Sequence, residues 1–231
     1  MNTQRILAIF EKDIKDFMKN MMLLMMPIVP IVLAVFYSRI GDGEAIPLIM
    51  IYIIIGVTFS AVTTSSMMTM MAEENEKKTL RGLMLSPASF MDIIIGKSLV
   101  IGLMTLLSFI ISLVIIGIEP ILNLRSVIGI FLVFLFFLFI GIGIGLFSKS
   151  IAVTSAYLMP VMFVFGFTPM IEFFGLGEDS LAMTIANFFP IMQLMAIHDT
   201  TSWLPLAVIL VWVLTTGLFM YFCFKKLMKD D

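Results

Sequence analysis

The segment IIIGKSLVIGLMTLLSFIISLVIIGI, residues 93–118, is a long apolar run with a single charge, Lys97. At about 1.5 Å of rise per residue, a helix of this length crosses the roughly 30 Å hydrocarbon core of a bilayer. Comparable runs, with no charge in their interiors, occur elsewhere in the chain. They cover residues 21–38, 47–71, 127–147, 151–170 and 205–224. The sequence therefore predicts six transmembrane helices.

The composition supports the same class. Of the 231 residues, 61% are apolar and only 13% are charged, where a soluble chain carries about 25% charged residues. This excludes a soluble domain, a disordered chain and a nucleic-acid binder, and it predicts one all-α integral membrane domain over residues 1–231. The only cysteine is Cys223 and the only histidine is His198, which excludes an intrachain disulfide and a Cys/His zinc site.

Residues 1–20 combine dense charge with apolar residues at helical spacing. Ile6, Phe10, Ile14 and Phe17 fall on one face, and the charges fall largely elsewhere. We interpret this segment as an amphipathic helix in the membrane interface; a helix with one solvated face is the alternative.

Residues 171–204 precede the sixth span and are harder to assign. Their apolar part, 181–197, is interrupted by Asn187, Pro190 and Gln193 and is marginal for crossing a membrane. We expect a re-entrant or interfacial pair of short helices here, on the extracellular side.

The distribution of Lys and Arg sets the orientation. With six spans and a cytoplasmic N-terminus, twelve of the fourteen basic residues lie inside, and only Arg39 and Arg125 lie outside. A seventh span over 181–197 would give nine against five. The positive-inside rule therefore predicts a multi-pass protein of the plasma membrane with both termini cytoplasmic.

The sequence lacks the residues that several classes of membrane protein require. No acid lies in mid-span for a proton relay, no catalytic pair is evident within the spans, and there is no arginine ladder. Gly96-Lys97-Ser98 resembles the end of a phosphate-binding loop, but Met91 replaces the required first glycine. We interpret Lys97 as an anchor that snorkels to the cytoplasmic surface. Any energy from ATP must then come from another chain.

The longest hydrophilic segment, AEENEKKTLRGLMLSPASFMD (72–92), joins the second and third spans. Leu80, Leu83 and Met84 repeat at helical spacing, and Pro87 marks a boundary. Ser89 and Asp92 match a capping box for the next helix. The pattern predicts a short amphipathic helix that docks a partner, or a solvated loop whose leucines dip into the interface.

This segment resembles the first cytoplasmic loop of ABC-2 type transporter permeases. The matching residues are Glu73, Glu74, Thr79, Leu80, Leu83, Leu85, Ser86 and Pro87, with Lys97 at the start of the third span. Lys78 stands where glycine is usual, and Arg81 where an acid is common. Phe188-Phe189-Pro190 resembles the family's proline stretch before the sixth span, so the resemblance extends to the whole layout.

The resemblance implies that 72–92, including Arg81, is a coupling helix that inserts into a separate ATPase subunit. The chain would then be a transport subunit and not an enzyme, without a cofactor of its own, since ATP and Mg²⁺ would bind to the partner ATPase. Two permeases, most simply a homodimer, and two ATPases would form the working unit, surrounded by membrane lipids. The small size resembles exporters of peptides, drugs and bacteriocins.

Other features bear on the cargo. The chain has 22 Met and 22 Phe, which suit a hydrophobic or amphipathic substrate such as a peptide, drug or lipid-like molecule, or which simply face lipid. Thr58, Thr63 and Ser66 either line a substrate path or bond across helices. Gly141 and Gly145 permit close packing, within the subunit in preference to a dimer. The rival functions are a membrane-embedded scaffold or pore without an energy source and, less favoured, an intramembrane enzyme.

Overall fold

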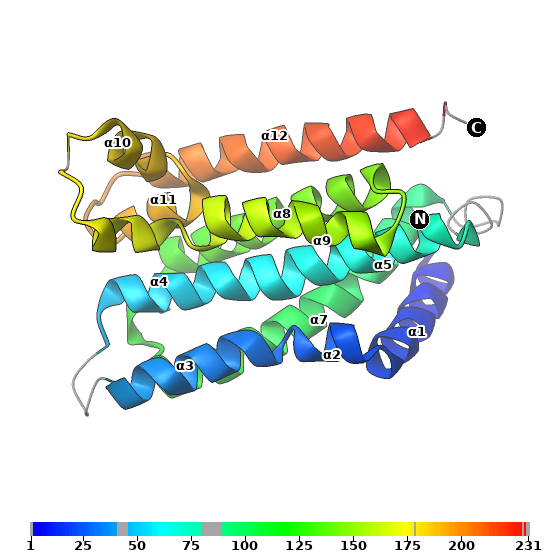
Figure 1. The fold of residues 1–231 in the computed structure, drawn as a ribbon, viewed down its shortest axis with the longest axis horizontal. Helices are drawn as coiled ribbons and strands as arrows, with labels where there is room; N and C mark the ends of the chain where they lie inside the picture. The colour runs from blue at the N-terminus through cyan, green and yellow to red at the C-terminus, as the bar shows by residue number, and fades with distance from the viewer. Residues whose placement is uncertain (1, 41–45, 80–88, 178, 228, 230–231) are drawn as a thin grey trace.

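In the computed structural model, the chain folds into a bundle of long helices (Figure 1). The structure describes residues 2–40, 46–79, 89–177, 179–227 and 229, and these contain no strand. Five helices in this part are long and apolar enough to cross a membrane: Met21–Ile40, Leu48–Glu76, Phe90–Ile116, Leu124–Phe147 and Leu204–Leu227. The bent pair Ile151–Gly166 and Thr168–Phe174 is the sixth candidate. The all-α membrane fold is therefore confirmed.

The spans are built from the following elements. The first consists of α2 (Met21–Met25) and α3 (Ile28–Ile40). The second runs through α4 (Leu48–Val57), the π-helix η1 (Thr58–Thr64) and α5 (Ser65–Glu76). The third, fourth and last are α7 (Phe90–Ile116), α8 (Leu124–Phe147) and α12 (Leu204–Leu227), and the short 3-10 helix η2 (Glu119–Ile121) lies between α7 and α8.

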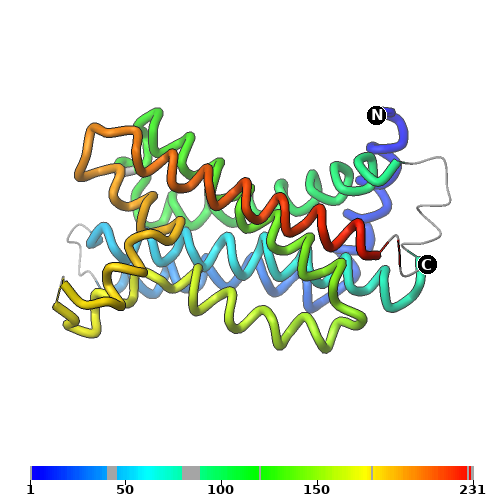
Figure 2. The backbone as a smooth tube through the Cα atoms, turned by 90° about the horizontal axis from the view of Figure 1, so that it is seen from above, coloured from blue at the N-terminus to red at the C-terminus, as the bar shows by residue number. Residues whose placement is uncertain are grey.

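The second span is the central element of the bundle. Of its apolar stretch, 83% is buried, against 17% for the first span and 22% for the last. Figures 1 and 2 show α4 and α5 running along the middle, with the other long helices around them. Because it is covered on all sides, this helix has no lipid-facing stripe, and its residues are hydrophobic or small all round.

The run expected to form one span at 151–170 is divided. It consists of α9 (Ile151–Val161) and the π-helix η3 (Met162–Gly166), followed after a bend of 63° by the 3-10 helix η4 (Thr168–Phe174). Pro160 lies inside α9 and Pro169 at the start of η4. Proline has no N–H to continue the helical ladder, which accounts for the break.

Glycines let α8 approach the central helix. A Cβ on Gly141 would lie 3.2 Å from the Cβ of Met67, and one on Gly145 would lie 2.6 Å from the Cβ of Met71. Both contacts are to residues of α5 in the same chain. The prediction that this glycine pair packs within the subunit is therefore confirmed.

The N-terminal segment forms the amphipathic helix α1 (Thr3–Lys19), which packs against α7. Its buried residues are Ile6, Ile9, Asp13 and Phe17. Phe10 and Ile14, expected on the same face as Ile6 and Phe17, are only half-buried. The helix is thus rotated from the expected face, and an acidic residue is turned inward. Asn20 ends α1 and also caps α2 through its side chain.

At the opposite end of the bundle, two short helices occupy the region expected to hold them: α10 (Leu181–Asn187) and α11 (Pro190–Ala196). Their depth in a membrane stays a prediction.

The connection from α11 to α12 is fixed from two sides. Tyr52 shares a hydrogen bond of 2.6 Å with His198. Arg125 donates to the backbone carbonyls of Thr200 and Ser202.

The close packing of α8 on α5 predicts that Gly145→Ala destabilises the fold by about 1–3 kcal/mol, because the added methyl overpacks a contact between main chains. Thermal unfolding in detergent measures this loss. Gly217→Ala on α12 is the matched control, since its Cβ would lie 3.6 Å from the Phe139 ring in ordinary contact. Equal melting temperatures for the two variants would contradict the packing argument.

Candidate functional site

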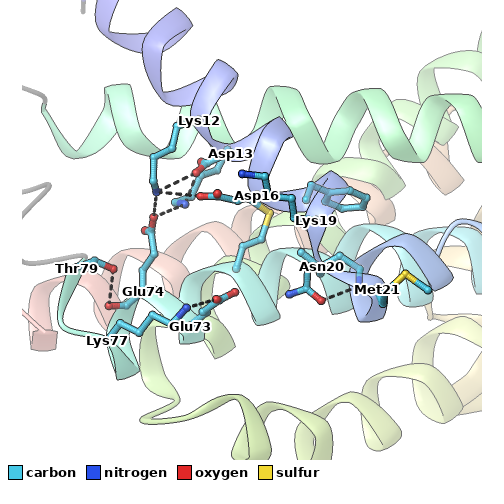
Figure 3. Close-up of a pocket in the computed structure, with 14 residues that line it drawn as sticks. Lys12, Asp13, Asp16, Lys19, Asn20, Met21, Glu73, Glu74, Lys77 and Thr79 are labelled. Atoms are coloured by element: carbon cyan, nitrogen blue, oxygen red, sulfur yellow. Dashed lines mark hydrogen bonds and ion pairs between the residues drawn. The ribbon is translucent and has the colours of Figure 1, made fainter.

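A charged cleft of about 630 Å³ opens at the end of the bundle where α1 and the end of α12 lie (Figures 1 and 3). One wall comes from α1 and the start of α2, and the other from the last turns of α5 and Thr79. Lys97 of α7 also lines it. The cleft is next in sequence to residues 80–88, which join this end of α5 to α7.

Four charged side chains form a connected network in the cleft. The ammonium of Lys97 lies 3.0 Å from Asp13 Oδ2 and 2.9 Å from Glu74 Oε1. The ammonium of Lys12 lies 2.9 Å from the same oxygen of Glu74 and 3.2 Å from Asp13 Oδ1. Since these residues belong to α1, α5 and α7, the network joins three helices through charge-assisted hydrogen bonds.

Lys97 is only 1% exposed, so the expectation that it snorkels to the surface is wrong. A buried ammonium is tolerated only when paired, and here two carboxylates from other helices reach it. Gly96 makes this possible, because a Cβ there would lie 2.7 Å from Cγ2 of Ile9. The missing side chain lets α1 come close enough for Asp13 to reach Lys97.

Lys12 is half-exposed at the edge of the network. Burial alone would lower the pKa of Lys12. The hydrogen bond that Lys12 donates to Glu74 and the negative charges of Glu74 and Asp13 outweigh this effect and raise the pKa above its usual value. Lys12 therefore stays charged at physiological pH.

The residues predicted to couple to an ATPase divide into two groups. Glu74 is buried in the network, Glu73 lines the cleft and pairs with Lys77, and Thr79 donates weakly, at 3.3 Å, to the backbone oxygen of Glu74. The other predicted coupling residues lie outside the described residues: Leu80, Arg81, Leu83, Leu85, Ser86 and Pro87. The predicted coupling helix is therefore untested.

The start of α7 matches the expected capping box. Ser89 Oγ accepts from Asp92 N at 3.2 Å, and Asp92 Oδ2 accepts from Ser89 N at 3.0 Å. The other oxygen of Asp92 accepts from the backbone N–H of Asn2, the N-cap of α1. The first turns of α1 and α7 are thus tied directly to each other.

The residues predicted for a substrate path are buried in the core of the single chain. Thr58 donates to Ile54 O, and Thr63 bonds to Thr105 of α7 at 3.0 Å. Ser66 Oγ has no partner among the described residues. The alternative, bonding across helices, is therefore observed for Thr63, while the substrate path stays a prediction.

Sequence reasoning assigned no site role to Lys12 or to the buried acid of the network, Asp13. Two signals could have pointed to Asp13. It is spaced seven residues from Ile6 and four from Phe17, so it lies on the buried stripe of α1. A lone lysine within an apolar run also either reaches the interface or pairs with a carboxylate elsewhere in the chain.

Comparison with known proteins then fixes the class. Residues 44–224 match the family described as ABC-2 family transporter protein. The chain belongs to this family. The match covers everything from α4 to most of α12, and so includes the α5 and α7 sides of the charged cleft. No curated protein matches the chain. An ABC-2 membrane subunit is a transport subunit that works with an ABC ATPase and is not itself catalytic.

The network predicts that Lys97→Ala destabilises this ABC-2 subunit by about 3–5 kcal/mol, because two carboxylates lose a buried partner. The change is read as a lower melting temperature in detergent. Lys15→Ala on the exposed side of α1 is the control and should change little. A Lys97→Ala protein as stable as Lys15→Ala would show that the network does not support the fold.

Proposed function

We propose that this chain is the permease of an ATP-driven exporter that moves a hydrophobic or amphipathic molecule out of the cell. In this proposal two ATPase subunits bind ATP and Mg²⁺ and dock on the end of the bundle that carries residues 80–88. The observation that carries the proposal is the buried Lys97 network, which joins α1, α5 and α7 on either side of that segment.

The network explains how a push on residues 80–88 would travel into the membrane. The ends of α5 and α7 cannot separate without breaking ion pairs in a buried site, which is costly. They and α1 would therefore move as one unit. The helix α5 is the last part of the central span, which is covered on all sides. A displacement of this unit would therefore shift the core of the bundle.

The distribution of charge supports a cytoplasmic location for this end. Lys12, Lys77 and Lys97 gather around the cleft, and Lys225 and Lys226 lie in the last turn of α12 at the same end. Arg39 lies in the last turn of α3, and Arg125 lies in the first turn of α8. Both are at the other end of the bundle. By the positive-inside rule the cleft and both termini face the cytoplasm of a plasma membrane.

A homodimer of permeases with the path between the two copies is the simplest assembly for such a subunit. Large apolar side chains on the outside of the bundle are available both to lipid and to a second copy, for example Phe131, Phe163 and Leu214. Their adaptable apolar surface also suits a peptide, drug or lipid-like cargo.

The proposal predicts that affinity purification from the native host in mild detergent recovers a roughly equimolar ATPase with a phosphate-binding loop. Leu83→Asp should abolish the substrate-stimulated ATPase activity of this complex, since a charge cannot enter an apolar docking groove. Leu176→Asp, on an exposed residue at the other end of the bundle, is the control. A complex without an ATPase, in several detergents, would favour a scaffold or pore without an energy source.

A second prediction concerns orientation. In a Cys223→Ser background, Lys229→Cys should react with a membrane-impermeant thiol reagent only after the cells are opened, and Gly177→Cys should react on intact cells. Both positions are exposed. Labelling of Lys229→Cys from outside would overturn the six-span topology.

A further inference from the structure

Glu74, which lines the charged cleft, has a carboxylate oxygen without a donor. Glu74 Oε1 is shared by the ammonium groups of Lys12 and Lys97. Glu74 Oε2 is buried and has no hydrogen-bond partner within the part of the chain that the structure describes. The side chain is only 9% exposed. A buried anionic oxygen without a donor costs free energy. A ligand that donates an N–H to this oxygen would remove that cost.

The charges of the cleft are balanced. Its lining holds four lysines, Lys12, Lys19, Lys77 and Lys97, and four acids, Asp13, Asp16, Glu73 and Glu74. Lys19 is exposed and forms no ion pair with the described acidic side chains. The cleft therefore presents an exposed cation, Lys19, and a buried carboxylate oxygen, Glu74 Oε2, that are not paired with each other or with another described residue. A ligand with both charges and no net charge complements it better than an anion or a cation does.

The cleft lies at the level where the first span begins. Met21, which starts α2, lines it, and Met18, Met21 and Met25 are 54–69% exposed beside the charged residues. Polar groups next to exposed apolar side chains along an amphipathic helix are typical of the boundary between lipid headgroups and acyl chains. A membrane lipid can place its headgroup in the cleft and its chains against these methionines.

We propose that this cleft binds the headgroup of a zwitterionic phospholipid with a primary amine. The ammonium donates to Glu74 Oε2, the phosphate faces Lys19, and the acyl chains lie along Met21. The lipid thereby completes the network that holds α1, α5 and α7 together. This binding site is independent of the proposed transport function, because it needs neither an ATPase nor a cargo.

The test uses the purified full chain in neutral detergent, with bound lipids counted by native mass spectrometry. Phosphatidylethanolamine, phosphatidylcholine and phosphatidylglycerol with identical acyl chains are compared. Choline keeps the positive charge but has no N–H, and glycerol has no cation. One charge-assisted hydrogen bond corresponds to about tenfold in affinity, so we expect phosphatidylethanolamine to bind about tenfold more tightly than phosphatidylcholine. Phosphatidylglycerol should bind least.

Glu74→Gln should remove the preference for phosphatidylethanolamine, because its amide keeps one acceptor for the lysines and puts a donor in place of Oε2. Glu76→Gln is the matched control: it lies on the same helix but outside the cleft, where Glu76 accepts from Ile151 N. If Glu74→Gln does not fold, Lys19→Gln tests the phosphate contact. It should weaken both zwitterionic lipids several-fold, while the exposed Lys15→Gln does not.

Three results would overturn the proposal. The first is equal binding of phosphatidylethanolamine and phosphatidylcholine to the wild-type chain, or strongest binding of phosphatidylglycerol. The second is unchanged lipid affinity in Lys19→Gln or an unchanged preference in Glu74→Gln. The third is competition by soluble phosphoethanolamine at the same concentration as the lipid, which would assign the site to a free headgroup and not to the bilayer.

Discussion

The buried ammonium of Lys97 is the constraint on which the end of the bundle that carries the charged cleft depends. A charge that is 1% exposed must have counter-charges, and these come from α1, 84 residues earlier, and from α5. This single requirement fixes the rotation of α1, the close approach at Gly96 and the position of the last turns of α5. The capping box at the start of α7 then joins its first turn to the first turn of α1 through Asp92.

The central span determines the rest of the packing. Since it is covered on all sides, every neighbour must fit closely against it, and the glycines of α8 and the Gly56–Gly166 contact between α4 and η3 satisfy this need. Two of its hydroxyl groups bond to neighbouring helices: Thr64 donates to Phe137 O of α8, and Thr63 pairs with Thr105 of α7. Such bonds satisfy polar groups that lipid could not.

The number of apolar runs, the cap at Ser89 and Asp92, and the intrachain role of Gly141 and Gly145 could be predicted because each depends on local spacing. The pairing of Lys97 with Asp13 could not, because its partner lies in a different helix far along the chain, and a lone basic residue near a span end has snorkelling as an equally local explanation. The bend after Gly166 lies where η3 packs closely against Gly56 of the central span, and the sequence does not show this contact. The six predicted coupling residues from Leu80 to Pro87 lie outside the described residues.

The clamp by Arg125 has a consequence for which side chains the connection between α11 and α12 can carry. The guanidinium holds the connection before α12 through the main-chain oxygens of Thr200 and Ser202, not through their side chains. Backbone recognition is indifferent to side-chain identity, so substitutions at these two positions keep the attachment as long as the main-chain path is kept. The side chains of this connection can thus vary, but Arg125 cannot be replaced by lysine without loss, since lysine lacks the planar two-pronged donor needed to hold both oxygens.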